Sequence, residues 1–193
     1  EVKLSKVKIL NSVAEDALNI ISSKFHLENV TIDGSPSDLF DSDFSHGSIA
    51  NSSFINAAGD GLDFSGSDIS AKNVYFSNIG DKSISVGEGT QFSAEGITIK
   101  NSSVGIAAKD GAIVDISSVK LKGKISSMAF MSYVKKEEFG PSVMKVFSVD
   151  SDNKVNFESI YPSLLYVDGK KIDSISKNVK KLYNSGFMKK KSI

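Results

Sequence analysis

The chain lacks cysteine and arginine altogether. Without a thiol there can be no disulfide bond, no thiolate metal site and no cysteine nucleophile. The absence of cysteine also means that the sequence does not indicate whether the protein works in a reducing or an oxidising compartment. All 23 basic residues are lysines. Because the planar guanidinium that recognises carboxylate or phosphate in a bidentate manner is missing, every arginine-based mechanism is excluded.

An excess of charge of one sign is also lacking, since 23 basic residues face 23 acidic residues. We therefore expect no nucleic-acid partner. No apolar run approaches the length of a membrane span, so we expect no membrane insertion. Residues 1–5 contain neither an initiator methionine nor the apolar core of a signal peptide. We expect the chain to be a fragment of a longer polypeptide, preceded there by further coils or another domain.

What the sequence does contain is a repeat. Apolar residues recur at steps of 22 or 23 in one column, which consists of Ile9, Ile32, Phe54, Phe76, Ile99 and Leu121. Three further columns keep the same step: Val7, Val30, Ser52, Val74, Ile97 and Val119; Leu4, Leu27, Ile49, Ala71, Ala94 and Ile116; and Phe25, Gly47, Ile69, Phe92 and Val114. The first and second columns lie two residues apart, as do the third and fourth, and two residues is the period of a strand. The pattern predicts short strands stacked coil upon coil.

Asparagine and glycine repeat as well, at positions that suit corners between strands. One set comprises Asn11, Gly34, Asn56, Asn78, Asn101 and Gly123, and a second comprises Asn29, Asn51 and Asn73. Both residue types tolerate the left-handed backbone of a tight corner, and stacked asparagine amides can form hydrogen bonds from coil to coil. The three prolines, Pro36, Pro141 and Pro162, avoid all these columns. Their positions agree with hydrogen-bonded strands in the columns.

These patterns predict an all-β fold, a right-handed parallel β-helix of about six coils of 22–23 residues, over residues 1–150. The first coil opens midway, and the coil after Lys124 is irregular. Residues 151–193 are expected to form a hairpin or last half-coil at 164–172, a short amphipathic helix at 174–183 that caps the solenoid, and a solvated lysine tail at 189–191.

With these repeats and asparagine corners, about two thirds of the chain resembles the pectate-lyase-like β-helix superfamily. The resemblance implies an acidic groove on an outer face that binds extended polysaccharides and cleaves them by hydrolysis or β-elimination, or epimerises them. The arginine base of pectate lyases has no counterpart here, so a lyase would need Lys82 or Lys109 as base, with a depressed pKa. His46 stands in Ser-His-Gly, and the arginine-lysine element of polygalacturonases is missing.

One strand of each coil carries the candidate site. Stacking places Asp41 beside Asp63 on the outer face at about 4.8 Å, the spacing of neighbouring strands. Candidate catalytic residues are Asp41, Asp43, Asp63, Lys82 and Lys109. Candidate ligand-binding residues are Asp38, Asp60, Ser65 and Ser85. Asp38, Asp60 and Asp81 also stand at a turn, where aspartate caps backbone amides, so a purely structural role is open for these three.

Two readings of the Asp41/Asp63 pair remain open. Like charges on neighbouring strands repel, so the pair should either hold a proton or bind a cation, and oxygen-only ligands suit calcium. Alternatively, paired carboxylates at such spacing match the acid and the nucleophile or base of glycoside hydrolysis.

We therefore expect a polysaccharide-recognising domain of a larger secreted or surface protein, with this acidic patch as its ligand, cation or catalytic site. If it is an enzyme, it is a glycoside hydrolase, a polysaccharide lyase or an epimerase. The alternative is a non-catalytic structural solenoid, a spacer or adhesin segment.

Overall fold

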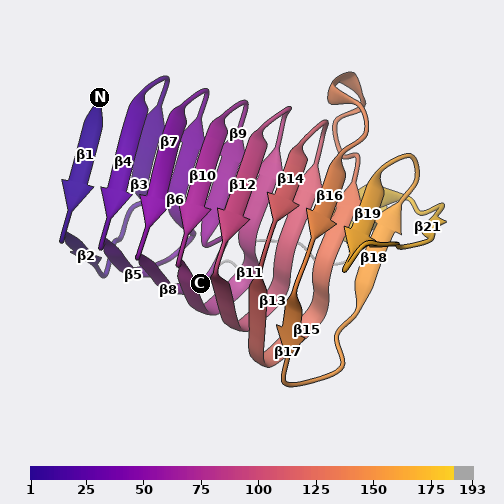
Figure 1. Cartoon of the computed structure of the whole chain (residues 1–193). Helices are drawn as coiled ribbons and strands as arrows, with labels where there is room; N and C mark the ends of the chain where they lie inside the picture. Colours follow the sequence, from indigo (N-terminus) through magenta and orange to yellow (C-terminus); the bar gives the residue numbers. More distant parts are fainter. Residues whose placement is uncertain (185–193) are drawn as a thin grey trace.

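The chain folds as a parallel β-solenoid of about eight coils, seen in a computed structural model that describes residues 1–184. The coils are stacked side by side from the N-terminal end, so that each strand pairs with its counterpart in the next coil (Figure 1). The predicted all-β class and the parallel coils of about 22 residues are confirmed.

One side of the solenoid is a nine-stranded sheet. In spatial order it contains β1 (Val2–Ser5), β4 (Lys24–Glu28), β7 (His46–Ala50), β10 (Asp68–Lys72), β12 (Gln91–Glu95), β14 (Ile113–Ile116), β16 (Val143–Val146), β19 (Leu164–Val167) and β20 (Lys170–Lys171). All neighbours pair in parallel except β20, which runs antiparallel to β19. The eight parallel strands supply one strand per coil.

The second sheet bends around the other two sides. Its separate strands are β2 (Lys8–Leu10), β3 (Asp16–Ile21), β5 (Thr31–Ser35), β6 (Asp38–Asp43), β8 (Ser53–Ala57), β9 (Leu62–Ser65), β17 (Val149–Ser151), β18 (Phe157–Ile160) and β21 (Ser174–Ile175). Three long strands run over both sides, β11 (Tyr75–Gly87), β13 (Ile97–Lys109) and β15 (Val119–Tyr133). We call one of these sides the acidic face; it comprises β3, β6, β9, β18 and residues 82–87, 104–109 and 128–133.

The residues of each predicted apolar column lie opposite one another in the observed strand register. Ile9 pairs with Ile32, Ile32 with Phe54 and Phe54 with Phe76. From Ile32 to Leu121 the members of this column are at most 2% exposed and pack in one continuous core. Aromatic residues stack within this core, with Phe54 and Phe76 ring centroids 5.5 Å apart. Burying these apolar side chains is the main stabilising contribution to the coil.

Gly47 interrupts a column of large residues because a neighbouring ring takes its space. A Cβ atom at this position would lie 2.3 Å from Cζ of Phe25, one coil earlier. The Phe25 ring thus fills the interior of two coils.

Asparagine stands at the corners, as predicted. Asn56, Asn78 and Asn101 all have a left-handed backbone, with φ between 55° and 58°. Asn78 Nδ2 donates to Asn56 Oδ1 at 3.0 Å, and Asn101 Nδ2 donates to Asn78 Oδ1 at 3.2 Å. The side chains therefore form a ladder along the solenoid, parallel to the backbone hydrogen bonds.

The prediction of about six coils was wrong, since the solenoid has about eight. Beyond Lys124 the sequence period is lost, but pairing continues: Ile113 is opposite Val143, and Val143 is opposite Leu164. Between Ile113 and Val143 the coil is longer than the usual 22 or 23 residues. Its extra residues form a loop at 134–142, which includes a 3-10 turn at Glu137–Phe139. A loop outside the sheet can absorb such an insertion without disturbing the register.

The C-terminal part follows the prediction only in part. Residues 164–172 form both a half-coil and a hairpin, because β19 pairs with β16 and with β20. The helix predicted at 174–183 is shorter: α1 spans Val179–Asn184. Its expected first turn is instead β21, which continues the sheet by pairing with β18. No helix of the described residues is long and apolar enough to cross a membrane, and the lysine tail at 189–191 lies outside them.

The sequence predicted that the C-terminal helix caps the end of the solenoid. Helix α1 instead lies against the acidic face. Leu182 and Val179 pack with Met131 and Tyr133, whose side chains point outward from β15. The cause is a local change in the outward columns, which are polar in the first coils and apolar at Ala107 and Met131. An apolar outer surface is stabilised when the amphipathic helix covers it.

The asparagine ladder generates a stability prediction. We expect Asn78→Ala to lower the free energy of unfolding by about 1–3 kcal/mol, because alanine loses both ladder bonds and is strained at positive φ. Asn78→Gly keeps the backbone conformation and should lose less. Denaturant unfolding of both variants measures this difference, and an equal loss would show that the backbone conformation contributes nothing.

Candidate functional site

The structure brings the predicted site residues together on the acidic face. Asp41 pairs with Asp63, and Asp43 with Ser65, as the repeat predicted. The period of 22 residues also predicts a ladder of Asp16, Asp38, Asp60 and Lys82 at the edge of this strand, and Asp16 does pair with Asp38 in parallel register. His26 and His46 lie elsewhere, on the nine-stranded sheet.

Asp41 is half-buried between other carboxylates. Asn19 Nδ2 donates to its Oδ2 at 3.3 Å. Burial, with the charges of Asp43 and Asp63, raises the pKa of Asp41 from 3.8 to about 7. The pKa of Asp43 is raised as well, by burial and by the charge of Asp63. A carboxyl group in this environment keeps its proton close to neutral pH.

Asp63 has the opposite environment although it stands beside Asp41. Burial acts to raise its pKa, but the ammonium groups of Lys109 and Lys82 outweigh burial, and the pKa is lowered. Lys109 Nζ lies 3.4 Å from Asp63 Oδ1, and 27% of the Asp63 side chain is exposed. Asp63 is therefore an ionised carboxylate that solvent or a ligand can reach.

Gly87 makes this ion pair possible. Lys109 is two coils away from Asp63, and its stem crosses the position where residue 87 would have a side chain. A Cβ atom at Gly87 would lie 2.7 Å from Cε of Lys109. The glycine thus leaves a channel in which the lysine reaches back to the carboxylate.

Lys82 is the centre of a buried charge cluster. Its Nζ lies 3.1 Å from Asp60 Oδ1 and 2.6 Å from Asp81 Oδ2, and the three side chains are 5–7% exposed. Two carboxylates share one ammonium group, so burial still raises the pKa of Asp60 to about 7. The pKa of Lys82 is raised, because the two carboxylates outweigh its own burial.

The depressed lysine pKa values that a lyase would need are therefore contradicted. The pKa of Lys109 is also raised, since Asp63 outweighs the effect of burial. Both lysines lie beside ionisable carboxyl groups that favour the protonated form. A raised pKa is the opposite of the depressed pKa that a general base needs near neutral pH.

Asp38 and Asp60 bind backbone amides at the turn. Asp38 Oδ1 accepts from Asp60 N at 2.7 Å, and Asp60 Oδ1 accepts from Lys82 N at 2.8 Å. Each carboxylate thus fastens its coil to the next, which is the structural role considered for both. Ser85 points outward beside Asp63 and is fully buried.

The corner next to the acidic face adds residues that the repeat did not indicate. Asp110 Oδ1 accepts from Lys135 N at 2.6 Å and from Lys136 N at 2.7 Å. Lys136 in turn forms an ion pair with Glu88. Both lysines belong to the inserted loop, which no period of 22 residues could place. The only feature of the sequence that could have indicated this corner is an acidic residue followed by glycine in two successive coils, at Glu88 and Asp110.

The calcium site predicted at Asp41 and Asp63 gains no further ligand. Within residues 1–184, no three Asp, Glu or His side chains are arranged so that they could hold a metal ion. The ionic partner of Asp63 is the ammonium group of Lys109, at 3.4 Å. Calcium binding stays a prediction.

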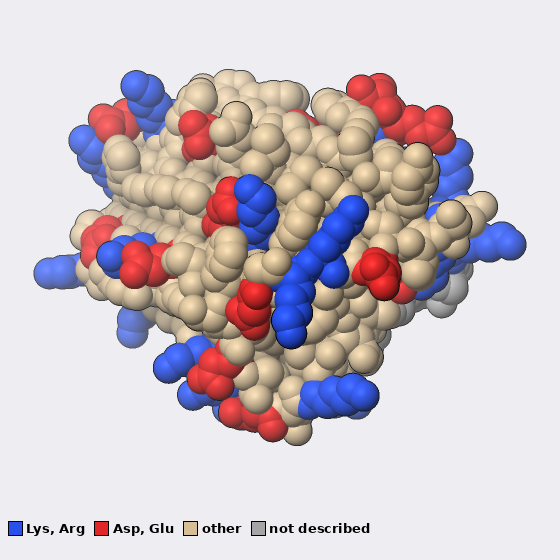
Figure 2. Space-filling model, turned by 45° about the vertical axis from the view of Figure 1, so that its right-hand side comes forward, with Lys and Arg blue, Asp and Glu red and all other residues tan. Residues whose placement is uncertain are grey.

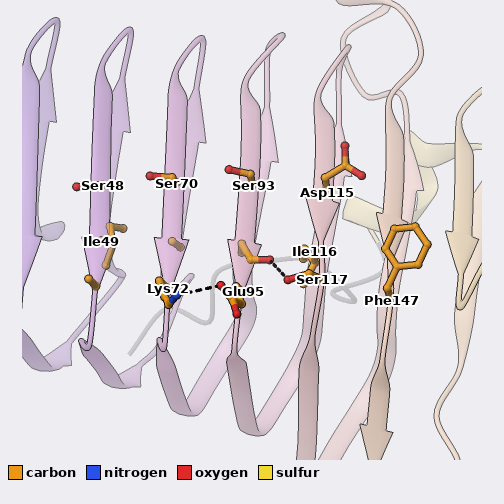
Figure 3. A pocket seen from close by; sticks show the side chains of 13 residues that line it. Ser48, Ile49, Ser70, Lys72, Ser93, Glu95, Asp115, Ile116, Ser117 and Phe147 are labelled. Atoms are coloured by element: carbon orange, nitrogen blue, oxygen red, sulfur yellow. Dashed lines mark hydrogen bonds and ion pairs between the residues drawn. The ribbon is translucent and has the colours of Figure 1, made fainter.

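A concave surface lies away from the acidic face, on the outer side of the nine-stranded sheet (Figure 3). Its volume is about 520 Å³, and the lining strands contribute a row of hydroxyls, Ser48, Ser70 and Ser93. Two of the charged side chains there form an ion pair, with Lys72 Nζ 3.1 Å from Glu95 Oε2. Over the face drawn in Figure 2, lysine and acidic side chains are likewise interspersed, and no large area has one sign. None of the predicted site residues lines this groove.

The shifted pKa of Asp41 makes stability depend on pH. Below about pH 4 the group is protonated in both states; as the pH rises to about 7, only the unfolded state loses the proton, which favours unfolding. Stability of the parent relative to Asp41→Asn should therefore fall between pH 4 and 7 and then level off. Denaturant unfolding over this range, with carboxyl NMR titration, measures the effect. A constant difference would contradict the assignment.

The buried cluster predicts a large effect of one lysine. Lys82→Met should lower the free energy of unfolding by about 3–5 kcal/mol, because two buried carboxyl groups lose their ammonium partner. Lys72→Met is the control: its ion pair with Glu95 has the same distance of 3.1 Å, but 62% of its side chain is exposed. Its loss should stay below about 1 kcal/mol. Similar small losses in thermal or denaturant unfolding would refute the role given to Lys82.

Comparison with known proteins adds no assignment to this geometry. No protein family, no curated protein and no solved structure matches the chain. The chain is a parallel β-solenoid, and its superfamily is not established by these comparisons.

Proposed function

We propose that the acidic face binds an extended polysaccharide and hydrolyses a glycosidic bond. The observation that carries the proposal is the Asp41/Asp63 pair, whose neighbouring carboxyl groups have pKa values displaced in opposite directions. Two titratable groups with divergent environments supply an acid and a base in one site. Both side chains are accessible from solvent, unlike the Lys82 cluster beside them.

The chemistry assigns one role to each residue. Asp41 gives its proton to the glycosidic oxygen as the bond to the anomeric carbon breaks, and the Asp63 carboxylate forms a new bond to that carbon. Water then displaces Asp63 and returns a proton to Asp41. Neighbouring strands are about 4.8 Å apart, near the ~5 Å separation of carboxyl groups in glycosidases that form such an intermediate. The proposal therefore includes retention of the anomeric configuration.

Asp41 and Asp43 also bear on the substrate class. Neither has an ammonium group within ion-pair distance among the described residues, so no cation at this end of the site would pair with the carboxylate of a uronic acid. A neutral polysaccharide needs no such cation, and its hydroxyl groups can donate to the carboxyl oxygens. We propose a neutral polymer as substrate.

Placement of the chain among the pectate-lyase-like β-helix proteins belongs to the same proposal. Coils of about 22 residues with asparagine at left-handed corners support it. Secretion or surface display is proposed because extended polysaccharides are met mainly outside the cell. Hydrolysis is preferred over β-elimination and epimerisation, since the pKa values of Lys82 and Lys109 are raised and a lysine base would need a depressed pKa.

A purely structural solenoid is the second candidate. It is favoured by the internal neutralisation of the patch, in which Lys82 and Lys109 pair with Asp60, Asp81 and Asp63. In that case Asp41 and Asp63 are dispensable, and removing their mutual repulsion stabilises the coil without any loss of function.

Hydrolysis is tested by counting new reducing ends from neutral glucans, xylans, mannans and galactans, with polyuronates for comparison. The parent should cleave a neutral polymer, and Asp41→Asn and Asp63→Asn should each lower the rate by about 10²–10⁴-fold while remaining folded. Asp68→Asn is the matched control, because its side chain is 69% exposed on the nine-stranded sheet; it should retain the parental rate. No cleavage of any polymer would favour the structural solenoid.

A further inference from the structure

The outward side chains of the acidic face change from accessible to enclosed along the solenoid. In one column, Asn19 is exposed, Asp41 and Asp63 are half-buried, and the next positions, Ser85 and Ala107, are fully buried. These residues face outward in the same register, so the core does not bury them. Other residues must therefore lie over these side chains on the outer side of the solenoid, from Ser85 onward; we call these residues the cover.

Part of the cover is Lys109, whose stem crosses Gly87 toward Asp63. The rest is helix α1. Leu182 is 8% exposed and packs with Ala107 and Met131 on the outer surface.

Tyr183 fixes this helix at the boundary of the accessible region. Its hydroxyl is 2.7 Å from that of Tyr133, and Lys135 Nζ lies 4.5 Å from its ring centroid. Tyr133 stands opposite Lys109 in the neighbouring coil, so this hydrogen bond holds Tyr183 on the acidic face. Burial raises the pKa of Tyr183, against the charges of Lys109 and Lys82. A hydrogen bond, a cation–π contact and apolar packing therefore hold one end of the cover.

We infer that the site is a groove closed at one end, and that the protein acts on the ends of polysaccharide chains, releasing short products. This inference rests on the proposed hydrolysis. A chain lying along the solenoid can extend over Asp41 and Asn19, but it meets Lys109 and the α1 cover one coil beyond Asp63. One coil is about 4.8 Å, which leaves space for about one sugar between the reacting bond and the wall.

The geometry makes Leu182 and Tyr183 determinants of specificity that take no part in the chemistry. Displacing α1 exposes Ala107 and Met131 and lengthens the groove past the reacting pair. Internal bonds would then reach Asp41 and Asp63. The bond broken and the two carboxyl roles stay the same, so only the position of cleavage along the polymer changes.

The experiment compares the 193-residue parent with Leu182→Asp and Tyr183→Ala. A neutral polymer cleaved by the parent is followed by reducing ends and by viscosity, and products are sized by chromatography. Tyr161→Ala is the matched control, because Tyr161 is 72% exposed and lies outside the cluster around α1. Thermal unfolding checks that each variant is folded, and hydrogen exchange at residues 104–109 reports whether the cover has opened.

The parent and Tyr161→Ala should release mono- or disaccharides from the start while viscosity falls slowly. Leu182→Asp should open the cover, lengthen the early products and increase the viscosity loss per bond cleaved several-fold; Tyr183→Ala should do so less. Long early products from the parent, or an unchanged pattern in a Leu182→Asp protein whose cover has opened, would overturn the closed groove alone. Absence of new reducing ends from every polymer would overturn the proposed function and the closed groove with it.

Discussion

Parallel stacking of equivalent residues, held by backbone hydrogen bonds between coils, is the constraint on which the rest of this structure depends. Each residue lies about 4.8 Å from its counterpart one coil away. A residue type that forms favourable contacts with its own kind can therefore recur at the same position in successive coils. The Asn56–Asn78–Asn101 ladder and the Phe54–Phe76 stack are examples. Where a contact between equivalents is unfavourable, the chain must compensate locally, and the acidic face is the clearest instance.

On the acidic face, lysine side chains neutralise some of the aspartates and not others, and this difference creates the candidate site. Asp60 is matched by Lys82 in the next coil, and Asp63 by Lys109 two coils on. Asp41 has no such ammonium partner among the described ion pairs and accepts only an amide hydrogen bond from Asn19 within its column. Adjacent members of one aspartate column thus differ in protonation, although they have the same residue type and strand geometry. Gly87 contributes to this difference, because the stem of Lys109 passes through the space that a side chain at position 87 would occupy.

Much of this arrangement could be predicted from the sequence, because a strict period carries three-dimensional information. The pairing of Asp41 with Asp63 and the corner asparagines follow from spacing alone. The period could not give the number of coils, since the loop at 134–142 hides the later strands, nor the place of Lys135 and Lys136 beside Asp110. The helix was misplaced because residues 174–183 have an amphipathic pattern, yet Ile175 gains more by extending the sheet. Lysine pKa values depend on which carboxylate each long side chain reaches, which spacing does not determine.

The most direct test of the account is a crystal structure of the Asp63→Asn variant with a neutral oligosaccharide that the parent cleaves. We predict a sugar chain along the acidic face, with one ring between residues 41 and 63 and its end against Lys109 and Tyr183. An oligosaccharide bound instead in the groove over β7, β10, β12 and β14, with the acidic face empty, would contradict the assignment of the site.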